Sequence, residues 1–347
     1  MYKTAPHSPA RAGFWIPLLA GALFCLTVAA TGMGFIPIPA TDVLQVMAHK
    51  LWGADVSGLD PLFVSVVSEV RLPRILTSAS VGFGLAVSGA VFQGILLNPL
   101  ADPFTLGVSS GAAFGASLAL LLGMSFASPP SVCLFAFAGA TLTLLAVMAI
   151  AGRDAGLSPT SLILSGVIVS AILSAGISFL KYMADERVSV IIFWLMGSFA
   201  SKTWGDVLFT ACIGLAGFAV CLHFARDLNV MSMGDRSARS LGVHTGRVRL
   251  VLLAAASLVS AVCVSVSGII GFVGLMVPHL MRFLTGPDNR LLIPASGLCG
   301  AILLLAADTL TRAVLPQEVP IGVLTALLGG PVFCVIFRRR HMGGGRG

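Results

Sequence analysis

The chain has 347 residues, of which 57% are hydrophobic and only 10% are charged. An ordinary soluble domain carries about 25% charged residues, so the composition excludes a soluble globular enzyme and a disordered chain. Apolar runs of about 20 residues are typical of bilayer-spanning helices. The net charge of +7 comes from scattered arginines without a basic run interleaved with aromatics, so nucleic acid is not an expected partner.

The first apolar segment, residues 14–35, is predicted to be a retained span, because no small-residue cleavage site follows it. Residues 36–70 carry several acids and predict a loop with a short interfacial helix. Nine further apolar segments follow at residues 72–96, 104–123, 130–151, 160–182, 205–225, 248–268, 271–285, 291–311 and 320–337. The sequence therefore predicts an all-α polytopic protein of about ten transmembrane helices, forming one domain over residues 1–347.

The distribution of Lys and Arg predicts the orientation. With ten spans both termini lie on one side, and if that side is the cytoplasm, inside segments hold 14 Lys and Arg residues and outside segments hold 7. Cytoplasmic loops carry such an excess, so both termini are predicted to be cytoplasmic.

A weak internal repeat connects two oppositely directed spans. Residues 87–89 and 266–268 both read Val-Ser-Gly, and each is followed ten residues after its glycine by a proline, Pro99 or Pro278. Inverted repeats are typical of transporters. A chance match in Gly- and Ser-rich spans is the alternative.

Residues for metal, cofactor or enzyme chemistry are missing. The seven cysteines lie in apolar runs without a C-x-x-C pair, and the histidines, His279 included, show no metal-ligand spacing. The sequence has no G-x-x-x-x-G-K-[ST] nucleotide-binding loop, no zinc-protease motif and no Ser/His/Asp set. No cofactor and no metal are expected, and any ATP used must be bound by another subunit.

Two arginines stand at the predicted outer end of the second span. Arg71 and Arg74 are three residues apart and share one helical face. Exposed guanidiniums at this place suit carboxylates on a docking partner. Interfacial anchoring by snorkelling is the alternative.

The stretch after the second span combines a turn with a small-residue face. Asn98-Pro99 and Asp102-Pro103 predict a turn. Gly107, Gly111 and Gly115 form a small-x-x-x-small face for close helix packing. On the residues alone, packing and turn formation account for the whole stretch.

These residues carry a resemblance. Residues 71–111 resemble the FecCD-type permeases of the ABC importers for iron-siderophores, haem and vitamin B12, which are BtuC-like type II importers. Later motifs match in the same order, at residues 194–198, 234–242, 268–282, 307–312, 318–322 and 328–333. The resemblance extends over about residues 14–340.

The resemblance implies the permease subunit of an ABC importer in the bacterial inner membrane. Its implied partners are a cytoplasmic ATPase dimer, a periplasmic or lipid-anchored substrate-binding protein, and a second permease subunit, with a homodimer favoured over a heterodimer. It also implies a pathway along the dimer axis, lined by the fifth span. The implied substrate is a metal chelate, with ferric siderophore as the default and haem or cobalamin as alternatives.

The resemblance also implies roles for individual residues. The residues that match the binding-protein docking arginines are Arg71, Arg74 and Arg312. Those that match a cytoplasmic gate are Asn98, Leu100, Thr160 and Ser161, for which turn formation and helix capping are the alternative. Residues 226–247 match the ATPase coupling loop, with Gly234, Arg236, Ala238, Arg239, Leu241 and Gly242 as its candidate residues and an ordinary basic loop as the alternative.

Asp308 is the only acid well inside a predicted span, which makes it a functional candidate. Arg312 follows one turn later, so a local ion pair is expected and structural pairing is favoured. An ion-coupled secondary transporter would be expected to carry several intramembrane carboxylates. An intramembrane enzyme would need a nucleophile–base pair or metal ligands at span depth, and the sequence contains neither.

Overall fold

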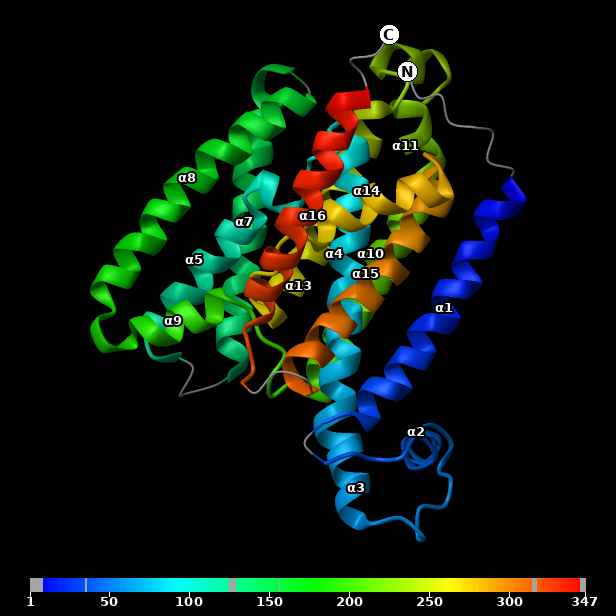
Figure 1. The fold of residues 1–347 in the computed structure, drawn as a ribbon. Helices are drawn as coiled ribbons and strands as arrows, with labels where there is room; N and C mark the ends of the chain where they lie inside the picture. Colours follow the sequence, from blue (N-terminus) through cyan, green and yellow to red (C-terminus); the bar gives the residue numbers. More distant parts are fainter. Residues whose placement is uncertain (1–8, 35, 125–128, 156, 314–316, 344–347) are drawn as a thin grey trace.

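The computed structural model describes residues 9–34, 36–124, 129–155, 157–313 and 317–343 (Figure 1). All regular structure in these ranges is helical, so the predicted all-α architecture is confirmed. The beginning of α1 and the end of α16 lie at the same end of the molecule, here called the terminal face. The opposite end, beyond which α2 lies, is called the far face.

In the described part of the chain, seven helices are long and apolar enough to cross a membrane, and three shorter apolar helices accompany them. These ten helices coincide with the ten predicted segments. The long ones are α1 (Pro9–Gly32), α4 (Leu72–Ile95), α7 (Pro129–Ala155), α8 (Pro159–Met183), α10 (Trp204–His223), α13 (Thr245–Ser267) and α15 (Asn289–Ala313). The short ones are α5 (Val108–Leu121), α14 (Val273–Thr285) and α16 (Ile321–Gly343), of which residues 321–334 are the apolar part.

Residues 36–70 contain more helix than predicted. The expected short helix is α2 (Ala40–Trp52), but α3 (Pro61–Ser65) then continues through a π-helical turn at Val66–Arg71 directly into α4. Asp60 caps the start of this continuous helix by accepting a hydrogen bond from the Leu62 backbone N–H at 2.8 Å. A proline follows in the first turn, where its missing N–H costs nothing. The second span therefore extends past the predicted boundary at residue 72.

The segment between the fifth and sixth spans also differs from the prediction. It contains a short apolar helix, α9 (Val188–Leu195), in a stretch where the sequence predicted no span. At eight residues the helix is too short for the 3.6-residue pattern to stand out from neighbouring apolar sequence. In Figure 1, α9 lies beside the far-face half of α5.

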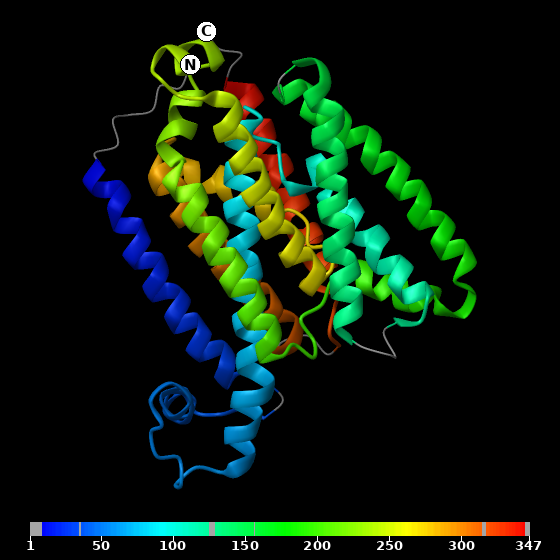
Figure 2. The same ribbon diagram turned by 180° about the vertical axis from the view of Figure 1, so that it is seen from behind.

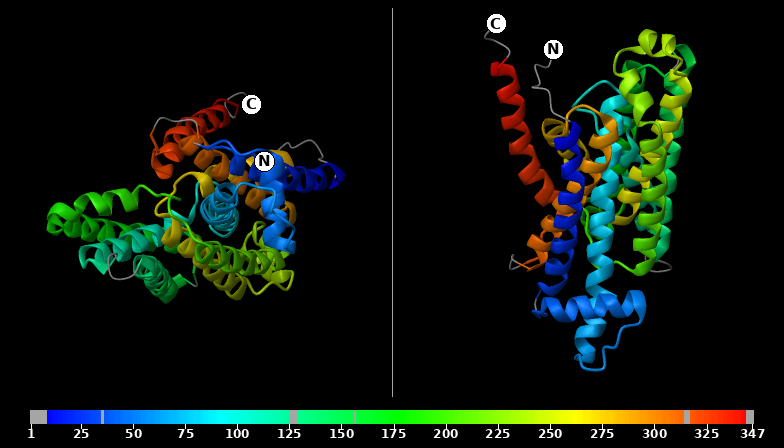
Figure 3. Two further views of the ribbon diagram at one scale, coloured as in Figure 1. Left: turned by 90° about the horizontal axis from the view of Figure 1, so that it is seen from below. Right: turned by 90° about the vertical axis from the view of Figure 1, so that its right-hand side faces the viewer.

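Helix α4 is the centre of the bundle (Figure 3, left). Glycines let neighbouring backbones touch it: a Cβ on Gly82 would collide with the Gly300 carbonyl of α15, and a Cβ on Gly89 with the Gly274 carbonyl of α14. Close backbone approach maximises van der Waals contact between membrane helices. Helices α4, α13 and α15 are accordingly the most buried of the spanning helices.

The predicted small-residue face on α5 is confirmed. A Cβ on Gly111 would meet Gly139 and Thr143 of α7, and one on Gly115 would collide with the Phe135 carbonyl of the same helix. This glycine face thus sets the close packing of α5 against α7.

Helices α8, α9 and α16 contrast with this centre. They expose large apolar side chains, among them Ile172 (66% exposed), Phe193 (67%) and Leu327 (65%). In Figure 1, α8 and α9 lie at one edge of the molecule and α16 runs across its front. Contiguous apolar surface on spanning helices must be covered by lipid or by another subunit.

Candidate functional site

Two arginines, the buried Arg71 and the partly buried Arg312, cap the end of helix α1 at the far face. Arg71 donates to the carbonyls of Thr31 at 2.8 Å and Ile36 at 2.6 Å. Arg312 donates to the carbonyls of Met33 at 2.7 Å and Ala30 at 2.8 Å. The last carbonyls of a helix have no intrahelical partner and carry partial negative charge, so guanidiniums from α15 and the turn before α4 complete the end of α1.

Gly34 makes this double cap possible. A Cβ at this position would lie 2.8 Å from Arg71 Nη2 and 2.9 Å from Arg312 Nη1, and its φ of +155° is one that side chains rarely adopt. Only glycine allows both guanidiniums to approach the turn after α1.

The third predicted docking arginine holds two carboxylates. Arg74 Nη2 lies 2.9 Å from Asp308 Oδ1, and Arg74 Nη1 lies 3.1 Å from Glu318 Oε1. The Arg74 and Asp308 side chains are 11% and 2% exposed, whereas Glu318 is 53% exposed. A buried ion pair of this kind requires good geometry and further hydrogen bonds to offset desolvation, and Arg74 Nε supplies one to each Asp308 oxygen, at 3.2 and 3.1 Å.

Two expectations about these residues were wrong. The docking hypothesis required exposed guanidiniums, but Arg71 is 6% exposed and donates its hydrogen bonds to backbone carbonyls. Asp308 was expected to pair with Arg312 one turn away, but it pairs with Arg74, since the nitrogens of Arg312 point to α1. Structural pairing of Asp308 is confirmed, with a different partner.

The predicted gate residues lie on two separate turns. Asn98 Oδ1 accepts from the Leu100 N–H at 2.9 Å, which confirms the predicted turn, and Leu100 is exposed. Ser161 donates its N–H to Ser158 Oγ, the cap of α8, and Thr160 is exposed in the same first turn. Among the described residues no hydrogen bond joins the two turns, so their gating role is not tested by the structure.

The predicted coupling loop is a chain of short helices on the terminal face. Helix α11 (Ala225–Met231) is followed by α12 (Asp235–Ser240) and then by α13. The breaks fall at Gly234 and Gly242, as predicted, with φ of +99° and +86°. Positive φ at both positions costs glycine nothing and strains other residues.

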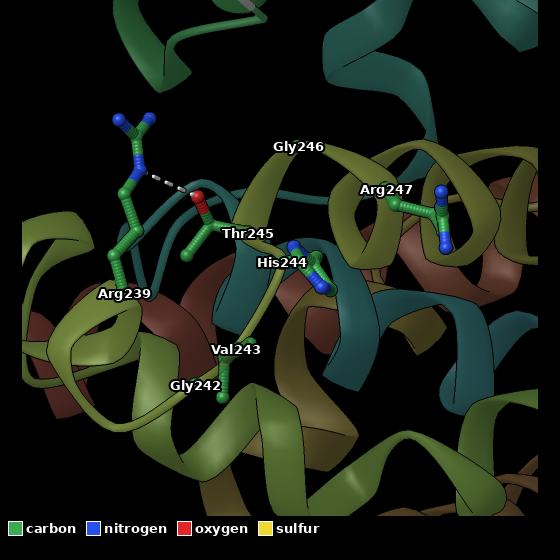
Figure 4. A pocket seen from close by; sticks show the side chains of 7 residues that line it. All are labelled: Arg239, Gly242, Val243, His244, Thr245, Gly246 and Arg247. Carbon is green, nitrogen blue, oxygen red and sulfur yellow. Dashed lines mark hydrogen bonds between the residues drawn. The ribbon is translucent and has the colours of Figure 1, made fainter.

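The two sides of α12 differ. Ala238 is buried, while Arg236, Arg239 and the apolar Leu241 are exposed. A cavity of about 520 Å³ lies next to Arg239, between the end of α12 and the start of α13. Figure 4 shows Arg239 reaching toward Thr245, to which its Nε donates at 3.3 Å.

The coupling loop is anchored to the spans by polar contacts. Arg249 of α13 pairs with Asp235 of α12 at 2.8 Å. Asn229 of α11 donates to Asp288 at 2.7 Å and accepts from the Asn289 backbone N–H, the first residue of α15, at 2.9 Å. These hydrogen bonds tie α11 directly to the start of α15.

Asp288 also forms an ion pair with Arg290. Hydrogen bonds from Arg290, at 2.7 Å from its Nη2, lower the pKa of the Asp288 carboxyl to about 2. The carboxylate just before α15 is thus ionised at neutral pH. Its negative charge also stabilises the N-terminus of α15 through the helix dipole.

Comparison with known proteins identifies the family to which this architecture belongs. Residues 21–339 match the model of the FecCD transport family. The chain belongs to this family. It is 44% identical over 282 residues to the cobalamin import system permease BtuC of Halobacterium salinarum, covering 80% of this chain and 74% of the relative. It is 41% identical to the hemin transport system permease HmuU of Yersinia pestis, covering 80% of this chain and 84% of that one.

A solved structure shows the same fold. An inward-facing metal-chelate type ABC transporter matches with a TM-score of 0.82 at 35% identity, over 93% of this chain and 98% of the other. The chain is therefore a multi-pass permease subunit of an ABC importer, and the expected BtuC-like fold is confirmed. Among the described residues, no group of three or more His, Cys, Asp or Glu side chains could hold a metal ion.

Proposed function

We propose that this FecCD permease translocates a metal chelate across the bacterial inner membrane, with a ferric siderophore as the first candidate substrate. Its relatives named for cobalamin and hemin, and the metal-chelate type structure, support the substrate class. Haem and cobalamin are the alternatives. The permease breaks no bond in its substrate, and ATP is hydrolysed by a dimer of separate ATPase subunits.

The coupling loop on the terminal face is the observation that carries this proposal. Its broken helices expose Arg236, Arg239 and Leu241 while Ala238 and the anchors at Asp235 and Asn229 hold it to the spans. A mixed basic and apolar surface on a rigid support suits a protein partner. In our proposal this face is cytoplasmic, both termini lie there, and residues 226–247 receive the ATPase movement.

Helix α15 would carry that movement across the membrane. At the terminal face Asn229 contacts Asn289, and at the far face Asp308 and Arg312 of the same helix contact Arg74 and the end of α1. Leu100 and Thr160 are exposed on two turns. In this proposal these turns form the cytoplasmic gate.

We propose that the binding protein docks at the far face, and that the three predicted arginines have two different roles there. Arg74 would contact the partner's carboxylates, because its surface neighbour Glu318 is half-exposed and displaceable. Arg71 and Arg312 would support docking by fixing the end of α1. The exposed apolar surfaces of α8, α9 and α16 would be covered in part by a second copy of the chain.

The class is tested by purifying the tagged chain from its native membrane and identifying co-purifying proteins by mass spectrometry. We expect an ABC ATPase in equal copy number and a binding protein, whose affinities for ferric siderophores, haem and cobalamin then rank the substrates. An oligomer without ATPase that transports under an ion gradient would contradict the proposal and turn attention to Asp308.

The coupling role is tested separately, by replacing residues 234–242 with a flexible Gly-Ser linker of equal length. We expect the ATPase still to hydrolyse ATP while uptake in proteoliposomes is lost, because the rigid contacts of α12 are gone. Normal uptake by this variant would rule out coupling through the segment.

A further inference from the structure

A cavity apart from the coupling loop and the two predicted gate turns lies near the far face. It has a volume of about 880 Å³ and opens between the first turns of α7 and α10. Residues at the end of α13 line its inner side, and Figure 2 shows α13 running between α7 and α10. The view from below shows α16 on the opposite side of the molecule (Figure 3, left).

The walls of this cavity are apolar and reach the surface. Leu134 and Phe137 of α7 and Phe209 of α10 line it, and Leu134 is 64% exposed. Phe137 and Phe209 meet edge to face with ring centroids 6.3 Å apart. Exposed apolar side chains at the end of a spanning helix face lipid, and aromatic rings are enriched at this depth.

One amine enters this apolar cavity. Lys202 Nζ donates to the Val266 carbonyl at 2.7 Å, which uses one of its three protons. Within the described ranges it has no second hydrogen-bond acceptor and no ion pair. Burial lowers the pKa of Lys202 from its ordinary value, so an anion beside the amine would stabilise its charged form.

One carboxylate lines the same cavity. Asp206 Oδ2 accepts from the Thr203 N–H and from Thr203 Oγ1, both at 2.9 Å, and thereby caps α10. Oδ1 accepts no hydrogen bond from any described residue. The Asp206 charge partly offsets the lowering of the Lys202 pKa by burial, but the two side chains form no hydrogen bond or ion pair with each other within the described ranges. The cavity thus offers a cationic donor and a free carboxylate oxygen.

We propose that this cavity binds a zwitterionic phospholipid with a primary amine in its headgroup, as in phosphatidylethanolamine. Lys202 would bind the phosphate, and Asp206 Oδ1 would accept from the headgroup ammonium. The acyl chains would lie along Leu134, Phe137 and Phe209. The headgroup carries one negative and one positive group, and the cavity offers one partner for each.

The proposal makes a specific ranking of lipids. The choline headgroup has no N–H to donate to Asp206, and the phosphatidylglycerol headgroup has no cation. Both should therefore bind more weakly than phosphatidylethanolamine with the same acyl chains, by about tenfold or more, since each lacks one charge-assisted hydrogen bond.

Native mass spectrometry of the full chain, incubated with an equimolar mixture of the three lipids, tests this ranking. We expect one phosphatidylethanolamine retained per subunit. Lys202→Gln should lower retention of all three lipids, whereas Asp206→Asn, which keeps an oxygen to cap α10, should remove only the preference for the primary amine. Lys181→Gln, which removes another lysine near the far face, is the matched control and should behave as wild type.

Several results would overturn the proposal. Equal retention of the three lipids would remove the headgroup assignment, and preferential retention of phosphatidylglycerol would identify an anionic-lipid site instead. Unchanged phosphatidylethanolamine retention in Lys202→Gln and Asp206→Asn would show that these side chains do not bind it. Thermal melting of each variant, with an unchanged midpoint, shows that the variants are folded.

Discussion

The far-face arginines near the end of α1 and the arginines on the surface of α12 are used in opposite ways. At the far face, Arg71 is buried and donates to backbone carbonyls, and the Arg74 side chain, 11% exposed, pairs with carboxylates. At the terminal face, Arg236 and Arg239 are exposed on a short helix between two glycine breaks. A guanidinium whose donors are satisfied within the chain stabilises the fold, and one that faces solvent remains free for a partner.

This comparison predicts which substitutions affect stability and which affect transport. Far-face substitutions should unfold the protein more readily, because they leave buried charges or carbonyls without partners. Substitutions on the surface of α12 should leave stability unchanged and lower coupling. The predictions below are ordered by their expected effect on stability.

Asp308→Ala should have the largest effect. It removes the buried partner of Arg74 and leaves that guanidinium with Glu318 alone, so we expect a loss of about 3 kcal/mol in unfolding free energy. Thermal or denaturant unfolding in detergent measures it. Glu318→Gln, at the exposed end of the same network, is the control and should cost less than about 1 kcal/mol.

Arg71→Ala should have the next largest effect, about 2 kcal/mol, because the carbonyls of Thr31 and Ile36 lose a charged donor. Arg71→Lys should recover only part of this loss, since an ammonium cannot reproduce the planar fork. Hydrogen exchange should show faster opening of the last turn of α1 in both variants. Equal exchange in wild type and Arg71→Ala would contradict the capping role.

The pH dependence of Asp288 should be smaller. Its pKa is lowered to about 2 in the folded chain, so its contribution to stability is present above the ordinary carboxyl pKa of about 4 and is lost as pH falls toward 2. We expect wild type to be more stable than Asp288→Asn at about pH 6 and the difference to shrink at about pH 3. A difference that is independent of pH would exclude the ionic contribution.

Arg236→Glu should have the smallest effect on stability, within about 0.5 kcal/mol, because the side chain is exposed. Its effect on transport should be large, since the charge that we propose to face the ATPase is reversed. ATPase binding and uptake in proteoliposomes measure this. Lys181→Glu, a charge reversal near the far face, should leave ATPase binding unchanged.

The sequence predicted those parts of the fold that depend on local pattern. Apolar runs predicted the seven long spanning helices and the three shorter ones of ten residues or more in the described part of the chain, and the glycine spacing in α5 predicted its contact with α7. Gly234 and Gly242 predicted the helix breaks of the coupling loop because positive φ is a property of the residue itself.

Parts that depend on distant contacts could not be predicted. Asp308 has Arg312 four residues away in sequence, but its partner is Arg74, 234 residues away. Sequence spacing describes one helix and contains no information on which helix packs beside it. The carbonyls at the end of α1, to which the buried Arg71 donates, could likewise not be predicted, because the sequence does not show which side chain lies beside the end of that helix.

One missed feature did have a local signal. Asp60 followed by Pro61 is a helix-start pattern, and it predicts the helix that continues into α4. The mixed polar composition of residues 36–70 obscured it.

The glycine contacts of α4 have a consequence for how this chain can change shape. Gly82 and Gly89 place backbone directly against backbone of α15 and α14, so no side-chain rotamer is available there to absorb a tilt. We therefore expect α4, α14 and α15 to behave as one rigid body. Movement that α15 receives from α11 at the terminal face would then displace α4 and α14 together with it, and opening and closing would shift this block of helices against the rest of the bundle.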